Sequence, residues 1–169
     1  MVIAQASINE NGKITGGKLG NQNGKELNIK CVKKNNFKYI LRFVNPQVQN
    51  NLALIAWIGA QNEHIGYDQT YRNTLWREAK KELSIGKIKV DCGCDCSSFV
   101  TVCAQLAYYS IFKEWLPGVD MSGNLPTTSN MIKKLRNTGR IVCYEKKEKV
   151  LPGDILVTPG KHTAIVVDV

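Results

Sequence analysis

The residues of this chain that could carry chemistry gather in one cysteine-rich stretch at positions 90–100. Asp95 is a good helix N-cap, because its carboxylate can accept hydrogen bonds from the unpaired N–H groups of a first helical turn. Cys96 then falls at or near the first helical position, where the positive end of the helix dipole favours thiolate over thiol. Because the thiolate is the form that attacks carbonyl groups, Cys96 is the candidate nucleophile.

A cysteine nucleophile needs a base, and the chain holds two histidines. His162 opens an apolar, β-rich run that follows a similar run at 154–157, so it is predicted to begin a buried strand. A strand holds a histidine rigidly, as a general base requires. His64 lies in a polar segment and is predicted to be a solvated surface residue. His162 is therefore the candidate base.

Three segments together resemble the NlpC-type papain-like cell-wall cysteine peptidases: Asp95-Cys96-Ser97-Ser98-Phe99-Val100, Pro152-Gly153-Asp154-Ile155-Leu156 and His162-Thr163-Ala164-Ile165-Val166. The match is closest to the lysins carried by phages of Gram-positive bacteria. Two more segments are similar to parts of that branch: Gly24-Lys25-Glu26, and Ile65-Gly66-Tyr67-Asp68-Gln69 with Arg72. The resemblance implies an α+β fold in which a central nucleophile helix packs on a small antiparallel β-sheet. It also implies a single catalytic domain over residues 1–169.

The function that this resemblance implies is hydrolysis of an amide bond in the peptide of bacterial peptidoglycan, without a cofactor. The enzyme would be an endopeptidase or an N-acetylmuramoyl-L-alanine amidase, and the sequence leaves that choice open. Cys96 would attack the carbonyl after His162 has taken its proton. Tyr67 or Gln22 is the candidate second donor to the oxyanion, beside the Cys96 backbone N–H. The substrate groove is expected to include Asp95, Ser97, Lys25, Glu26 and Asp68.

A third polar residue normally orients the histidine in this family, and it usually lies on the strand after the histidine strand. This chain stops at Val169, only seven positions past His162. Asp168 shares a strand face with His162 but lies far along the strand. Two explanations stay open: the orienting residue comes from elsewhere in the chain, or the chain is truncated at its C-terminus and the following strand is missing.

Length and composition fit one domain with a sizeable core, since the chain has 169 residues of which 43% are hydrophobic. No run approaches the length of a membrane span. The N-terminus lacks the charged region and long apolar stretch of a signal peptide. We therefore expect an intracellular protein, which, if phage-encoded, is made in the host cytoplasm and then released to the cell wall.

The net charge of +9 favours an anionic partner. The lysines are spread as singles and pairs rather than in one basic and aromatic stripe, so nucleic acid is not the expected partner. A Gram-positive wall, with its anionic teichoic acid, suits the charge equally well. The oligomeric state is left open.

The six cysteines leave two other functions open. Without a signal peptide, reduced thiols are expected. The alternation of Cys92, Cys94 and Cys96 differs from the two-residue gap of a zinc knuckle, so no metal is expected. In an extended stretch, however, the three would share a face, and Cys31 or Cys143 could complete a metal site. The alternatives to an enzyme are thus a cysteine-rich zinc-binding or redox module and a non-catalytic cell-wall-binding domain.

The elements needed to position these residues follow from periodicity and turn signals. Helices that precede a run of strands indicate an α+β fold. The predicted elements are a short strand at 5–8; a β-hairpin of 26–32 and 37–43 around a turn at 33–36; a helix from Asn45-Pro46 to Gly59; a helix from Asp68 through Leu83; a central buried helix from Cys96 to Phe112; a short helix capped at 127–129 and ending near Gly139; and strands at 141–144, 154–157 and 162–168.

Overall fold

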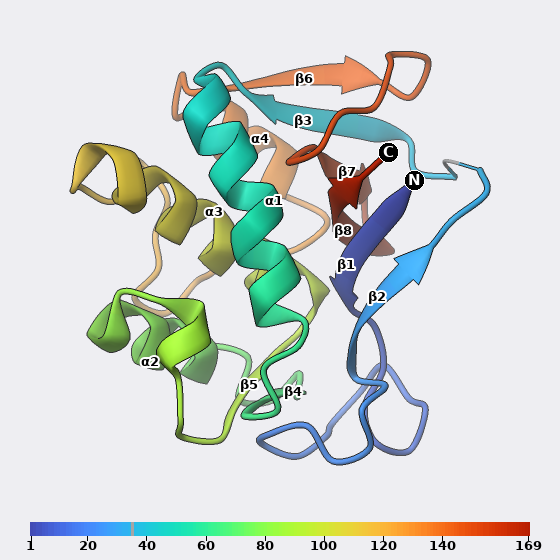
Figure 1. Ribbon diagram of the computed structural model, residues 1–169, viewed down its shortest axis with the longest axis vertical. Coiled ribbons are helices and arrows are strands. Elements are labelled where there is room, and N and C mark those ends of the chain that lie inside the picture. Colours follow the sequence, from blue (N-terminus) through green and yellow to red (C-terminus); the bar gives the residue numbers. More distant parts are fainter. Residues whose placement is uncertain (35) are drawn as a thin grey trace.

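The computed structural model describes residues 1–34 and 36–169 and has an α+β fold. Its main sheet has the strand order β2-β1-β8-β7-β3-β6, and every neighbouring pair is antiparallel. These strands are β1 (Val2–Ala6), β2 (Leu27–Cys31), β3 (Tyr39–Phe43), β6 (Ile141–Glu145), β7 (Ile155–Thr158) and β8 (His162–Asp168). The first and last strands are neighbours, with Val2 opposite Asp168, so the two termini lie side by side (Figure 1).

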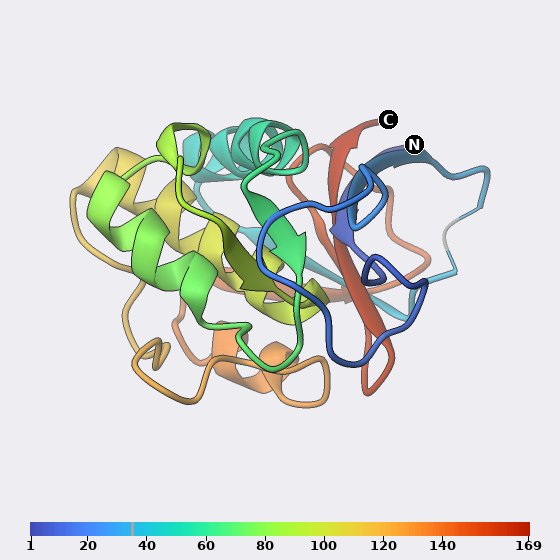
Figure 2. The same cartoon turned by 90° about the horizontal axis from the view of Figure 1, so that it is seen from below.

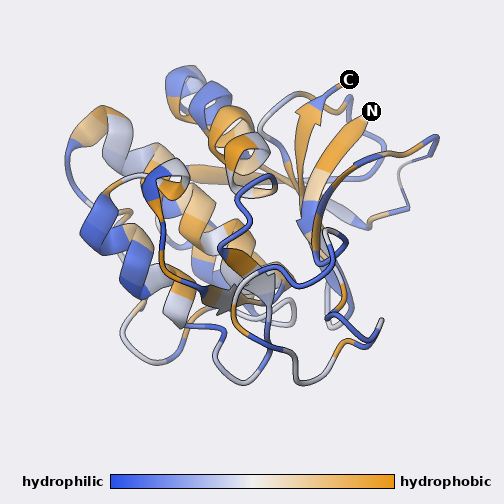
Figure 3. Ribbon diagram, turned by 60° about the horizontal axis from the view of Figure 1, so that its bottom comes forward, coloured by the Kyte–Doolittle hydropathy of each residue, from blue (hydrophilic) through white to orange (hydrophobic). Residues whose placement is uncertain are grey.

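The helices lie to one side of strands β1 and β8 (Figure 2). The two longest, α1 (Pro46–Gly59) and α3 (Cys96–Phe112), pack against each other and against β8. They enclose the larger core, and α3 is hydrophobic over most of its length (Figure 3). The smaller helices are α2 (Thr74–Glu82), the 3-10 turn η1 (Ile85–Lys87) and α4 (Met131–Arg136).

A second, smaller core lies on the opposite face of the sheet. Side chains alternate along a strand, so Ile165 of β8 joins the core beneath the helices while Ala164 and Val166 join the second core. By the same alternation, His162 points to the face of Ala164. Phe37, which is half-buried, packs against this second core and stacks on the His162 ring.

The start of α3 is fixed by its cap. The Asp95 carboxylate accepts a hydrogen bond of 2.7 Å from the Ser98 backbone N–H, and the Ser98 hydroxyl accepts one of 2.8 Å from the Asp95 N–H. This reciprocal capping box sets Cys96 as the first residue of the helix. The predicted cap at Asn45 is also present, with its side chain accepting from the N–H groups of Gln47 and Val48.

The predicted hairpin of 26–32 and 37–43 is wrong. Both strands form, but β2 pairs with β1 at one edge of the sheet, whereas β3 pairs with β6 and β7 near the other edge. Part of the predicted turn at 33–36 lies outside the described residues, at position 35. The helix expected from Asp68 begins only at Thr74, because Asp68 instead closes a turn and Tyr67 ends β4 (Ile65–Tyr67). A parallel partner for β4, the unpredicted β5 (Cys92–Cys94), leads directly into α3.

Across the described residues, we find no helix that combines the length and the apolar character needed to cross a membrane.

Candidate active site

The Cys96 thiol lies at the N-terminus of α3, against the first residues of β8. Backbone N–H groups of Thr163 and Ser97 hydrogen-bond to its sulfur, and both bonds lower the pKa of the thiol. Burial and then the negative charge of Asp95 act the other way and raise the pKa of Cys96 to about 11. The position of Cys96 at the helix N-terminus is therefore not sufficient to make the thiolate its main form at neutral pH. At neutral pH the thiol keeps its proton and needs a base to remove it.

His162 precedes Thr163, so the start of β8 brings an imidazole and the thiol to the same end of the strand. Burial lowers the pKa of His162 below its ordinary 6.5, so the ring is neutral at pH 7. In the described chain, Nε2 has a hydrogen-bond partner but Nδ1 has none, and no hydrogen bond joins the ring directly to Cys96. A neutral ring with a free nitrogen is what a general base requires.

The partner of His162 is Gln5 of β1, whose amide oxygen lies 2.8 Å from Nε2. The orientation of this amide is fixed in turn, because the Gln5 NH2 group donates to Asn28 Oδ1 at 3.2 Å. Asn28 of β2 is anchored by donating to the Lys25 carbonyl oxygen at 3.0 Å. Since an amide oxygen can only accept, Nε2 must carry the ring proton and Nδ1 the lone pair. Three adjacent strands thus set the tautomer of His162.

Arg72 ties the nucleophile turn to a distant loop. Its Nε and Nη2 donate to the Asp95 carboxylate at 2.6 and 3.2 Å, and Nη2 also donates to the Ser97 hydroxyl at 2.9 Å. The same guanidinium donates to the carbonyl oxygens of Leu125 and Pro126. This forked pairing uses the planar geometry of arginine. Arg72 also lowers the pKa of Cys96, so it partly offsets the effect of Asp95 on the thiol.

Tyr67 is the predicted oxyanion donor that the structure brings close to the thiol. It is buried, and its pKa is raised first by burial and next by the electrostatic interaction with nearby Cys96. Its hydroxyl donates to the Ile14 carbonyl oxygen at 2.9 Å. The other candidate, Gln22, has its side-chain amide on the carbonyl oxygens of Leu19 and Gly20 and contacts neither Cys96 nor His162 in the described structure.

Most of the side chains expected in the substrate groove instead hold the backbone. The fully buried Glu26 carboxylate accepts from the N–H groups of Gln22 and Tyr67, at 2.7 and 2.9 Å. The buried Asp68 carboxylate accepts from the N–H groups of Thr70 and Tyr71. Asp95 and Ser97 are both buried and are engaged by Arg72. Of the five predicted groove residues, Lys25 alone is exposed.

The structure does not bring Asp168 to the histidine. It lies at the opposite end of β8, six residues or about 20 Å away along an extended strand. Gln5 takes the place predicted for an orienting residue, and sequence reasoning missed it. The available signal was a single amide within the apolar segment Val2–Ala6. The sequence does not indicate which residue this amide contacts, because nothing in it places the first strand beside the last.

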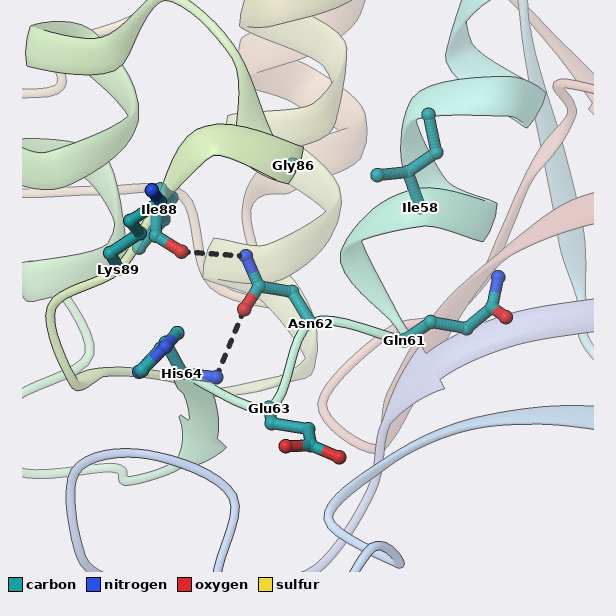
Figure 4. Close-up of a pocket in the computed structure, with 8 residues that line it drawn as sticks. All are labelled: Ile58, Gln61, Asn62, Glu63, His64, Gly86, Ile88 and Lys89. Atoms are coloured by element: carbon teal, nitrogen blue, oxygen red, sulfur yellow. Dashed lines mark hydrogen bonds between the residues drawn. The ribbon is translucent and has the colours of Figure 1, made fainter.

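His64 is a surface residue, as predicted. Its Nδ1 lies 2.8 Å from the Asp91 carboxylate, and both side chains are exposed. It lines a shallow pocket whose wall is held by Asn62, which donates to the Ile88 carbonyl oxygen and accepts from the His64 N–H (Figure 4). Nothing in the described structure connects this pocket to Cys96.

All six cysteines are free. Cys92, Cys94 and Cys103 are buried, and burial raises the pKa of each. Cys31 is exposed on β2 and Cys143 is half-buried on β6, at opposite edges of the main sheet, whereas β5 belongs to a separate two-stranded sheet. Within residues 1–34 and 36–169, no three His, Cys, Asp or Glu side chains are grouped so that they could hold a metal ion.

The N-terminus of α3, with Cys96, and the start of β8, with His162, thus lie close together, and a cysteine hydrolase uses this pair of residue types. Residues 3–169 match the family described as the endolysin-like domain, and the chain belongs to this family. Membership indicates a lytic role with bacterial peptidoglycan as the substrate. Comparisons with the curated proteins and with the solved structures found no match.

Proposed function

We propose that this endolysin-like chain is a cysteine hydrolase with a papain-like, NlpC-type catalytic domain that cuts an amide bond in the peptide of peptidoglycan. The observation that carries the proposal is the arrangement at the start of β8. There the Cys96 sulfur accepts a hydrogen bond from the Thr163 N–H. The residue before Thr163 is His162, a neutral imidazole whose Nε2 is bound by the Gln5 amide oxygen. Cys96 is the nucleophile, His162 the base and Gln5 the positioning residue.

The reaction starts from a neutral pair, because burial raises the thiol pKa and lowers the imidazole pKa. His162 Nδ1 takes the Cys96 proton as the sulfur attacks the amide carbonyl. The resulting imidazolium gives that proton to the leaving amine as the C–N bond breaks, which leaves a thioester on Cys96. Water, deprotonated by His162, then attacks the thioester and releases the carboxylate product and the free thiol.

The negative charge that develops on the carbonyl oxygen needs donors. The Cys96 N–H belongs to the first turn of α3, where backbone N–H groups have no partner within the helix. The Tyr67 hydroxyl is the second donor, which requires it to turn from the Ile14 carbonyl oxygen toward the substrate.

The positive surface suits a polyanionic wall, and we propose that teichoic acid raises the local concentration of the enzyme. The net charge of +9 supports this electrostatic attraction, which salt would screen over a distance of about 8–10 Å. A phage-encoded protein of this kind would be made in the host cytoplasm and act after release to the wall.

Digestion of purified Gram-positive walls tests the proposed chemistry. We expect the protein to release new amino groups together with new carboxylates, and mass spectrometry of the fragments will distinguish an endopeptidase from an N-acetylmuramoyl-L-alanine amidase. EDTA should leave the rate unchanged. New reducing sugar ends without new amino groups, which would indicate cleavage of the glycan, would contradict the proposal.

A further inference from the structure

A cavity adjoins His162 on the side of the ring that Phe37 covers. Three segments form it: the approach to β3, the end of β7, and the turn that leads into β8. Its lining residues are Asn36, Phe37, Lys38, Thr158, Lys161 and His162. The Phe37 and His162 ring centroids are 5.9 Å apart, so the cavity has an aromatic wall that includes the candidate base.

The charge of this cavity is carried by two lysines. Lys38 and Lys161 are both exposed, and neither forms an ion pair in the part of the chain that the structure describes. Their backbones are well anchored, since the Lys38 N–H donates to the Val157 carbonyl oxygen and the Lys161 N–H to the Thr158 carbonyl oxygen. Carboxylates are absent from the lining. The cavity therefore offers two ammonium groups and an apolar wall to one small anion-bearing residue.

The proton transfer from His162 decides which half of the substrate lies next to this cavity. His162 must deliver a proton to the leaving amine, so that amine lies within hydrogen-bond reach of the ring. The acyl half stays bonded to the Cys96 sulfur. The residue that carries the leaving amine is therefore the half of the substrate nearest the cavity beside His162.

We propose that this cavity is the leaving-group subsite, and that Lys38 and Lys161 select a wall-peptide residue that carries a free carboxylate next to the leaving amine. A carboxylate at this position would bind the two ammonium groups, whereas the corresponding carboxamide would not, because amidation removes the charge that the lysines bind. The inference rests on the proposed Cys96 and His162 mechanism. It adds a preference for unamidated substrate to that mechanism.

The test uses two soluble wall peptides that contain the bond cut in whole walls. They differ only in one group, a carboxylate or a carboxamide on the residue that carries the leaving amine. We expect the wild type to prefer the carboxylate peptide by about tenfold in kcat/KM, mainly through KM, because each exposed ion pair contributes modestly. Replacing both lysines, by Lys38→Met and Lys161→Met, should abolish the preference, so that the ratio of kcat/KM for the two peptides falls to about one.

A matched pair, Lys80→Met with Lys87→Met, removes the same charge from α2 and η1 and should keep the preference. The subsite is refuted if the wild type cuts both peptides equally, or if its preference survives in the variant that lacks Lys38 and Lys161. Failure of the proposed Cys96 and His162 mechanism would give a different result in the same assay. In that case Cys96→Ala would cut both peptides as fast as the wild type, whatever the lysines do.

Discussion

Replacing Gln5 tests whether the first strand supplies a working part of the site. Gln5→Leu leaves an apolar side chain of similar bulk but removes the acceptor that holds His162 Nε2 at 2.8 Å. The ring can then rotate or change tautomer, and the lone pair is no longer held on Nδ1. A net hydrogen bond of about 1.4 kcal/mol corresponds to a tenfold change in the productive population. We therefore expect kcat to fall about tenfold, with KM nearly unchanged.

The charged variant Gln5→Glu separates positioning from simple structural support. It keeps an acceptor at the same place but adds a negative charge beside the buried imidazole, which favours the protonated ring and raises the pKa of His162. Because the mechanism needs a neutral ring, the acid limb of the pH profile should move to higher pH. Activity should then be lost at a pH where the wild type still works.

The assay is the rate of wall hydrolysis from pH 5 to 9, with thermal unfolding measured on the same samples. Gln22→Leu is the matched control, because that amide bonds only to loop carbonyl oxygens. It should leave kcat and the pH profile unchanged. Wild-type kcat in Gln5→Leu, or an unmoved acid limb in Gln5→Glu, would refute the role assigned to Gln5.

Three further outcomes follow from the buried charges. Arg72→Met leaves the Asp95 carboxylate buried without its partner, so it should lower the free energy of unfolding by about 3 kcal/mol and the Tm by about 10 °C in calorimetry; an unchanged Tm would contradict this. Glu26→Gln sets an NH2 group against one of two backbone donors and should cost about 2 kcal/mol in urea unfolding, whereas a neutral result would mean that the carboxylate is replaceable. Stability should fall on acidification below about pH 6.5, because the unfolded chain then binds a proton that the His162 ring resists in the folded protein, and activity should fall only at lower pH, where the folded ring itself takes a proton; a stability that is flat from pH 7 to 5 would count against a neutral ring held by burial.

The local signals in the sequence predicted the elements that carry Cys96 and His162 well. Asp95 is the cap of a helix that runs from Cys96 to Phe112, as its carboxylate and the apolar run after it indicated. His162 begins β8 as expected. Caps and strand starts depend on neighbours within a few positions, and the sequence displays those neighbours directly.

Features that depend on distant pairing were not predictable in the same way. Residues 27–31 and 39–43 have the pattern of a hairpin, yet they pair with β1 and with β6 and β7. Gln5 acquires its role only because β1 lies beside β8. Likewise, Glu26 and Asp68 have the polarity of groove residues but accept backbone N–H groups in buried turns. Polarity alone does not tell a ligand-binding carboxylate from one that holds a loop.

Wall hydrolysis by Cys96→Ala is the measurement that tests the central claim most directly. The substitution removes one sulfur atom from a half-buried helix position, and circular dichroism with thermal unfolding will establish that the variant is folded. If the thiol forms the covalent bond to the substrate, the folded variant should lose at least about a thousandfold in rate. A folded Cys96→Ala protein that digests walls within tenfold of the wild-type rate would contradict the mechanism proposed for this endolysin-like chain.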